Sequence, residues 1–240
     1  MRPRLEGIRG LAVLTLAAGC ALARGAAPDG LKPYTATYTG IWNGMTVAVS
    51  TLKLEHTGDN WTYTARSKAR GVGRLASGVF PPHQVSVVQV SDQGVLPQSF
   101  KSSGGESAKS IDLKYDWQEK KVTGTYEGSA VDLPLTPQVQ DDGSVQLALM
   151  VAILAGHLPP TVQLIDKNSV REYQFTREGE ETLKTPMGDV RTVVFKSQKQ
   201  YSPRITRFWC APDRGYVPMQ VEQKKGDDVQ WTLRIESLTR

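Results

Sequence analysis

Alternation of apolar and polar residues dominates this chain, in short runs bounded by Gly, Asp, Asn or Pro. The clearest run covers residues 111–117, where every odd position is apolar and every even position is charged, and residues 229–236 repeat the pattern. Successive side chains of a β-strand point to opposite faces, so each run predicts a strand with one buried and one wet face. Similar runs cover residues 34–38, 45–54, 61–65, 85–90, 171–175, 190–195, 205–209 and 217–221.

One segment, residues 144–158, breaks the alternation because it is apolar on most faces. Asp141 and Asp142 precede it, and Gly156 and a Pro-Pro pair mark its end, which is the punctuation of a helix. A helix that is apolar nearly all round must be enclosed by protein. We therefore expect a mainly β fold, a curved antiparallel sheet or partly open β-barrel of about 10 to 13 strands that encloses one buried helix. That helix is either plain core or the lining or plug of an apolar ligand cavity.

The N-terminus has the layout of a bacterial export signal: Arg2, Arg4 and Arg9 precede an apolar run and then small residues. That run is too short for a transmembrane helix, which needs about 20 residues. Two interpretations stay open, a signal peptide over residues 1–23 or a lipoprotein signal over residues 1–19 with Cys20 lipidated. Residues 24–32 then form a linker and residues 33–240 a single β-rich domain. We expect a periplasmic protein, and an outer-membrane lipoprotein if Cys20 is acylated.

The charge is mildly positive, +5 for the whole chain and +3 once the three Arg and one Glu of residues 1–23 are removed. This excess permits contact with anionic lipids or glycans without demanding it. No dense Lys/Arg run of the kind expected for nucleic-acid binding occurs. Cys210 is the single cysteine left after cleavage at Ala23, and it is predicted to be a small buried hydrophobe.

Recognisable catalytic motifs are missing. There is no G-x-S-x-G elbow, G-x-G-x-x-G loop, P-loop or C-x-x-C pair, and His56, His83 and His157 lack metal-ligand spacing. No catalytic residue, metal ligand or cofactor is therefore predicted. Aromatic residues on strands are better candidates for ligand contact, because they can stack on sugars or wall an acyl chain. The candidate ligand-binding residues are Trp117, Arg207, Trp209 and Tyr216.

The segments 173–175 (YQF), 179–188 (GEETLKTPMG), 207–218 (RFWCAPDRGYVP) and 221–223 (VEQ) resemble an exported bacterial family, the domain of unknown function 3108. The opening at residues 34–42 and the Gln140-Asp141 pair are also similar, and the resemblance spans about residues 33–238. It implies a mainly antiparallel β fold in the envelope of Gram-negative bacteria, with no assigned activity. Within its W-x-A-P-D-x-G-Y-x-P block, Pro212 and Gly215 predict a turn, across which Trp209 and Tyr216 are expected to pack.

Three functions follow as hypotheses. The first is a non-enzymatic carrier or binding protein for an envelope lipid, glycan or partner protein. The second is an enzyme acting on polysaccharide through paired carboxylates, drawn from Asp112, Asp116 and Glu222. The third is a scaffold that docks another envelope protein through a sheet edge or apolar patch.

Overall fold

The computed structural model describes residues 27–71, 83–91, 94–103, 110–136 and 139–240. The export segment and Cys20 lie outside the described residues, so the two interpretations of that segment stay predictions. Leu31, within the predicted linker, is buried in the main core.

All strands of the described chain belong to one sheet of fifteen strands. The sequence indicated ten to thirteen, so the expected number was too low. The strands are β1 Tyr34–Trp42, β2 Met45–Thr57, β3 Asn60–Ala69, β4 His83–Ser91, β5 Gly94–Ser103, β6 Ile111–Asp116, β7 Lys121–Tyr126, β8 Ser129–Pro134, β9 Val139–Gln140, β10 Thr161–Ile165, β11 Val170–Thr185, β12 Gly188–Lys199, β13 Arg204–Ala211, β14 Val217–Lys225 and β15 Asp228–Thr239.

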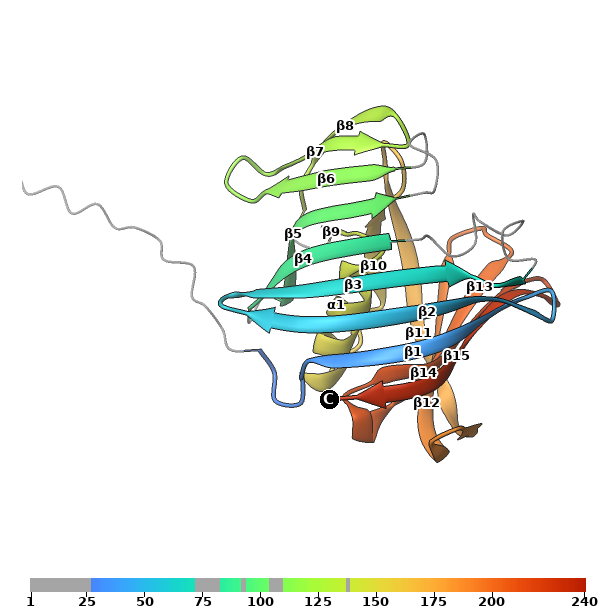
Figure 1. Cartoon of the computed structure of the whole chain (residues 1–240). Helices are drawn as coiled ribbons and strands as arrows, with labels where there is room; N and C mark the ends of the chain where they lie inside the picture. Colours follow the sequence, from blue (N-terminus) through green and yellow to red (C-terminus); the bar gives the residue numbers. More distant parts are fainter. Residues whose placement is uncertain (1–26, 72–82, 92–93, 104–109, 137–138) are drawn as a thin grey trace, which may run out of the picture.

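Strand β1 lies in the middle of the sheet, and the chain fills one half from the middle outward and the other half from the far edge inward. Strands β1 to β8 run as an antiparallel meander to one edge. The chain then crosses through β9 and helix α1 (Ser144–Leu154) to β10, which pairs with β9 in parallel, and returns by antiparallel steps to β15, which pairs with β1. The result is a strongly curved, open sheet wrapped around α1, as Figure 1 shows.

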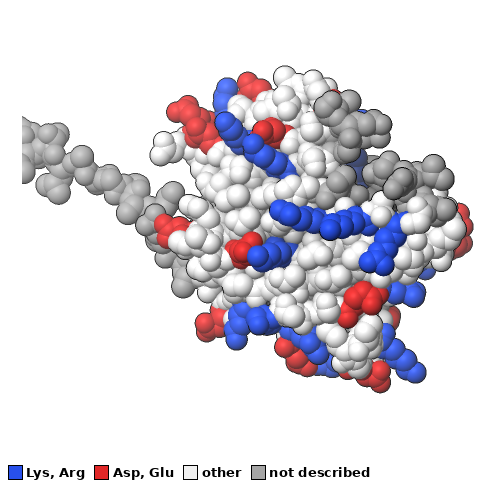
Figure 2. Space-filling model, viewed as in Figure 1, with Lys and Arg blue, Asp and Glu red and all other residues white. Residues whose placement is uncertain are grey.

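The alternation seen in the sequence matches the two faces of this sheet. In β1 and β6 every second residue is buried, and those residues face the core. The opposite, outer face of the N-terminal strands carries scattered lysine and arginine side chains among uncharged ones (Figure 2). The predicted mainly β fold with a curved sheet and one enclosed helix is confirmed.

Helix α1 begins where the sequence predicts and ends earlier, at Leu154 instead of residue 158. Gly156 stops it by adopting a φ of +82°, a conformation that costs glycine little. Leu147, Met150 and Val151 pack into the main core, and Leu149 packs into a smaller cluster under β10 and β11. No helix in the described part of the chain is long and apolar enough to cross a membrane.

Candidate functional site

Strands β11 to β13 present alternate side chains to α1 and so form the floor of a groove on the concave side of the sheet. In β12 these side chains belong to Val193, Phe195, Ser197 and Lys199, and the neighbouring strands continue the same rows. The groove holds three hollows in series, here called the polar hollow, the apolar slot and the charged hollow. From Arg191 to Lys199 the β12 row spans about 26 Å.

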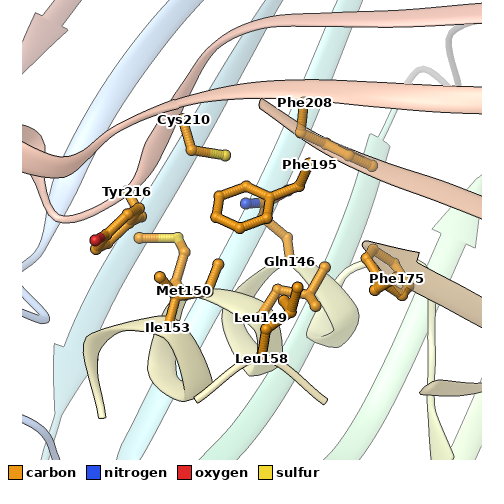
Figure 3. A pocket seen from close by; sticks show the side chains of 10 residues that line it. All are labelled: Gln146, Leu149, Met150, Ile153, Leu158, Phe175, Phe195, Phe208, Cys210 and Tyr216. Atoms are coloured by element: carbon orange, nitrogen blue, oxygen red, sulfur yellow. The ribbon is translucent and has the colours of Figure 1, made fainter. Parts of the chain in front are cut away.

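The apolar slot lies in the middle of the groove, where α1 covers the sheet (Figure 3). Its free volume is only about 10 Å³, room for about one water molecule. The rings of Phe195 and Tyr216 meet edge to face at a centroid distance of 6.4 Å. The lining residues are Gln146, Leu149, Met150, Ile153, Leu158, Phe175, Phe195, Phe208, Cys210 and Tyr216.

The charged hollow opens from the slot at the C-terminal end of α1 and holds about 330 Å³. The two spaces share Ile153, Leu158, Phe195 and Tyr216, so the apolar lining of the slot continues into the hollow. The remaining lining residues are Gly156, His157, Arg177, Glu180, Arg191, Val193 and Pro212.

Two arginines of the charged hollow share one carboxylate. Arg177 Nη2 lies 2.7 Å from Glu180 Oε1, and Arg191 Nη1 lies 3.5 Å from Glu180 Oε2. Arg191 also reaches Asp213 at 3.8 Å. All these side chains are about half exposed or more, so the ion pairs are weak and a competing anion can replace them at little cost.

The polar hollow lies at the other end of the groove, near the start of α1, and holds about 370 Å³. Its lining mixes charges of both signs with hydroxyl and amide groups. The residues are Tyr126, Asp142, Leu164, Ile165, Asp166, Tyr173, Ser197, Lys199, Ser202, Arg204, Thr206 and Gln223.

Asp141 fixes the start of α1. Its Oδ1 accepts hydrogen bonds from the backbone N–H groups of Gly143 (2.9 Å) and Ser144 (2.8 Å), and its Oδ2 accepts from the hydroxyls of Ser86 and Tyr115 (both 3.2 Å). Burial raises the pKa of Asp141, while the hydrogen bonds from Ser144, Ser86 and Gly143 oppose that rise. The N-cap itself is Gly143, so the acidic residue that holds the helix start, Asp141, lies two positions before the cap, whereas Asp142 faces the polar hollow.

Cys210 is a buried wall of the apolar slot and, as predicted, behaves as a small hydrophobe. Burial holds the pKa of its thiol far above the ordinary value, so the thiolate needed for nucleophilic attack does not form. No group of three His, Cys, Asp or Glu side chains in the described ranges is arranged to hold a metal ion.

The four candidate ligand-binding residues do not form one site. Tyr216 lines both the apolar slot and the charged hollow. Phe208 and Cys210 face the slot, so Arg207 and Trp209, which alternate with them on β13, point to the outer face. There Arg207 Nε pairs with Glu178 Oε2 at 2.6 Å, and Trp209 Nε1 donates to Glu181 Oε2 at 2.8 Å.

The expected packing of Trp209 on Tyr216 is therefore wrong, because the two side chains leave opposite faces of the sheet. Trp117 is also remote from the groove. It packs beside the cluster formed mainly by β5 to β8, and its indole N–H donates to the Pro97 carbonyl at 2.7 Å. The predicted turn after Ala211 is present: Pro212–Arg214 form a short 3₁₀ turn, and Gly215 adopts a φ of +58°.

The carboxylates proposed for an enzyme do not pair. Six strands separate β6, which carries Asp112 and Asp116, from β14, which carries Glu222. Asp112 and Asp116 are four residues apart on one strand, which places them about 13 Å from each other and beyond the reach of a carboxylate dyad. Asp112 pairs with Lys101 at 3.1 Å, and Asp116 accepts hydrogen bonds from the turn amides of Gln118 and Glu119.

Most groove residues escaped the sequence analysis, among them Phe175, Arg177, Arg191 and Phe195. The available signal was the alternation of residues 191–199, in which every odd position now faces the groove. That pattern identifies a shared face without telling which face the helix covers.

Comparison with known proteins gives a family and no activity. A family model described as "Protein of unknown function (DUF3108)" matches residues 33–230. None of the curated proteins matches the chain. Among solved structures, a protein of Bacteroides fragilis described as a candidate exported protein with a YmcC-like fold is 15% identical, and the match covers 87% of this chain and 94% of that one with a TM-score of 0.38. With its family model spanning most of the sequence, this chain belongs to the DUF3108 family of proteins of unknown function.

Proposed function

We propose that this protein is a non-enzymatic binding protein for an amphiphile, a molecule with an apolar chain and an anionic head. The main observation behind this proposal is that the apolar slot continues into the charged hollow, since the two spaces share four lining residues. An apolar chain would enter between α1 and β12, while its head would remain beside Arg177 and Arg191.

The head is expected to be a phosphate or carboxylate. A guanidinium binds both groups through paired N–H donors, and two guanidinium groups already converge on the Glu180 carboxylate. An incoming anion would compete with Glu180 for the same donors. The contacts of Glu180 are exposed, so displacing it costs little.

The chain requires the slot to widen, because a volume of about 10 Å³ cannot hold several methylene groups. The two ends of α1 are held differently. Its start is pinned by the four hydrogen bonds of Asp141, whereas Ile153 and Leu158 near its end make apolar contacts that other apolar groups can replace. Movement of the C-terminal half of α1 would open the slot toward the charged hollow.

Tyr216 stands at the junction of slot and hollow. Its φ of +59° is unusual for a bulky residue and costs of order 1 kcal/mol. The ring contacts Phe195, while the hydroxyl points away from the apolar side chains (Figure 3). This placement suits a residue that contacts both the chain and the head of an amphiphile.

The N-terminal segment supports placing this activity in the bacterial envelope, with the protein either free in the periplasm or anchored through Cys20. Envelope lipids supply apolar chains with phosphate heads in that compartment. The mild positive charge of the chain is compatible with such partners.

The test uses cis-parinaric acid, a fluorescent fatty acid, titrated into the purified protein. The wild type is expected to bind at micromolar concentration. Ile153→Glu places a carboxylate at the mouth of the slot and should weaken binding at least tenfold. Met45→Glu, at an exposed apolar position at the start of β2, is the matched control and should bind as the wild type does.

Equal binding by the Ile153→Glu protein, or no saturable binding by the wild type, would overturn the proposal. The second result would favour the scaffold hypothesis. Circular dichroism of each variant separates loss of the site from loss of the fold.

A further inference from the structure

The polar hollow is a second cavity, at the opposite end of the groove from the site proposed above. Ten of its twelve lining residues carry polar side chains, and its volume of about 370 Å³ falls within the range of small-molecule sites. Nothing in the amphiphile proposal uses it.

Two opposite charges face this hollow without a partner. In the described part of the chain, neither Asp142 nor Arg204 has an oppositely charged side chain within ion-pair distance, although both line the same space. Lys199 and Asp166, which also line it, are paired with each other at 3.6 Å, and Asp166 further meets Arg171 at 3.9 Å. The unsatisfied charges are therefore one carboxylate and one guanidinium.

Two further carboxyl groups, those of Asp141 and Asp166, lie near enough to Asp142 to affect its ionisation. Burial, Asp141 and Asp166 together raise its pKa to about 6, even though its side chain is open to the hollow. Burial also raises the pKa of Tyr126 and Tyr173, with the Asp142 and Asp166 carboxylates adding to the rise. An ammonium group beside Asp142 would meet an unpaired carboxylate and the rings of two neutral tyrosines, which is a favourable setting for a cation.

The other side of the hollow suits an anion. Arg204 contributes a free guanidinium, and Ser197, Ser202 and Thr206 line the space near it with hydroxyl groups. We propose that the polar hollow binds a small zwitterion, with its ammonium group against Asp142 and its phosphate or carboxylate against Arg204. The hollow is lined by two acidic side chains, Asp142 and Asp166, and two basic ones, Lys199 and Arg204. Their charges balance, so the hollow does not favour a simple cation or a simple anion.

The chemistry fits both a free zwitterion and the zwitterionic head of a lipid. The probes are therefore phosphoethanolamine, 4-aminobutyrate, and vesicles of phosphatidylcholine with or without phosphatidylethanolamine. Ethanolamine, inorganic phosphate and glucose test the two halves of the ligand and a neutral sugar. Binding is measured by isothermal titration calorimetry for the soluble probes and by co-sedimentation for the vesicles.

At least one zwitterionic probe is expected to bind ten times more tightly than ethanolamine, phosphate or glucose. Asp142→Asn and Arg204→Gln should each weaken that binding at least tenfold. Asp132→Asn and Arg66→Gln, on β8 and β3 outside the hollow, are the matched controls and should leave it unchanged. If only the soluble probes bind, the ligand is a free metabolite. If vesicles that contain phosphatidylethanolamine also bind, the ligand is the head of a lipid.

The proposal is overturned if no zwitterionic probe binds, if glucose or a single-charge probe binds as tightly, or if the two hollow variants bind as the wild type does. Thermal unfolding of each variant shows whether the fold is intact. Asp142→Asn is expected to bind cis-parinaric acid as the wild type does. Failure of the zwitterion proposal therefore leaves the amphiphile proposal standing, and failure of the amphiphile proposal leaves the zwitterion proposal standing.

Discussion

Replacing Asp141 with alanine removes the acceptor of four hydrogen bonds, two from the start of α1 and two from side chains of β4 and β6. Loss of the acceptor for the N–H groups of Gly143 and Ser144 at the helix start costs about 1 kcal/mol, as for a lost helix cap. The hydroxyls of Ser86 and Tyr115 would be left in the interior without that acceptor, at about 1–3 kcal/mol each. Removing a buried carboxylate offsets part of this cost, as the raised pKa of Asp141 indicates. We expect Asp141→Ala to lower the free energy of unfolding by about 3 kcal/mol.

Urea denaturation followed by tryptophan fluorescence measures the change in the free energy of unfolding. In thermal denaturation, the melting temperature should fall by about 6–12 °C. Asp142→Ala is the matched control, since Asp142 is the next residue and its exposed side chain has no hydrogen bond or ion pair among the described residues. Its effect should remain within about 1 kcal/mol. If the two variants were equally stable, the assignment of Asp141 as the anchor of α1 would be refuted.

Three further predictions concern the hollow, a strand and the slot. The raised pKa of Asp142 stabilises the protein below pH 4, and this contribution disappears as the pH rises through about 6. Asp142→Asn should remove this pH dependence from the free energy of unfolding, a change of less than about 1 kcal/mol because the side chain is open to water. A variant whose stability varies with pH as that of the wild type does would contradict the prediction. Gly124→Ala should destabilise by more than about 2 kcal/mol, because φ is +142° and the new Cβ would lie against the Asp112 carbonyl oxygen. Gly128→Ala, where φ is +80° and space is open, should lose less in the same denaturation assay, and equal losses would argue against the clash. Cys210 should react with Ellman's reagent in urea but not in buffer; rapid reaction of the folded protein would show that the slot is open.

The sequence predicted ten of the fifteen strands and the helix, because each of these contains its own periodic signal. Strands β5, β7, β8, β9 and β10 lie outside the predicted runs. In β7, Val122 is the single buried residue and Gly124 interrupts the strand, and the two-residue β9 is too short for any periodicity. The order of the strands could not be predicted. The pairing of β1 with β15 joins the two ends of the domain, and local residue patterns carry no information about such a contact.

The candidate site was harder to predict than the fold, for a geometric reason. Alternation along β13 puts Arg207 with Trp209 on one face and Phe208 with Cys210 on the other, but both faces contain aromatic and polar groups. The position of α1 alone decides which face becomes a cavity. Tyr216 was identified from its aromatic character, whereas Arg177 joins the charged hollow from beside an irregularity in β11 that residue type does not reveal.

The most direct test of amphiphile binding is photolabelling with a diazirine-bearing fatty acid, followed by mass spectrometry of the labelled peptides. The proposed site predicts labels within residues 146–158, 193–195 and 208–216, all suppressed by an excess of unlabelled fatty acid. Labels confined to the outer face of β2 to β6, or labels that the competitor does not reduce, would contradict it.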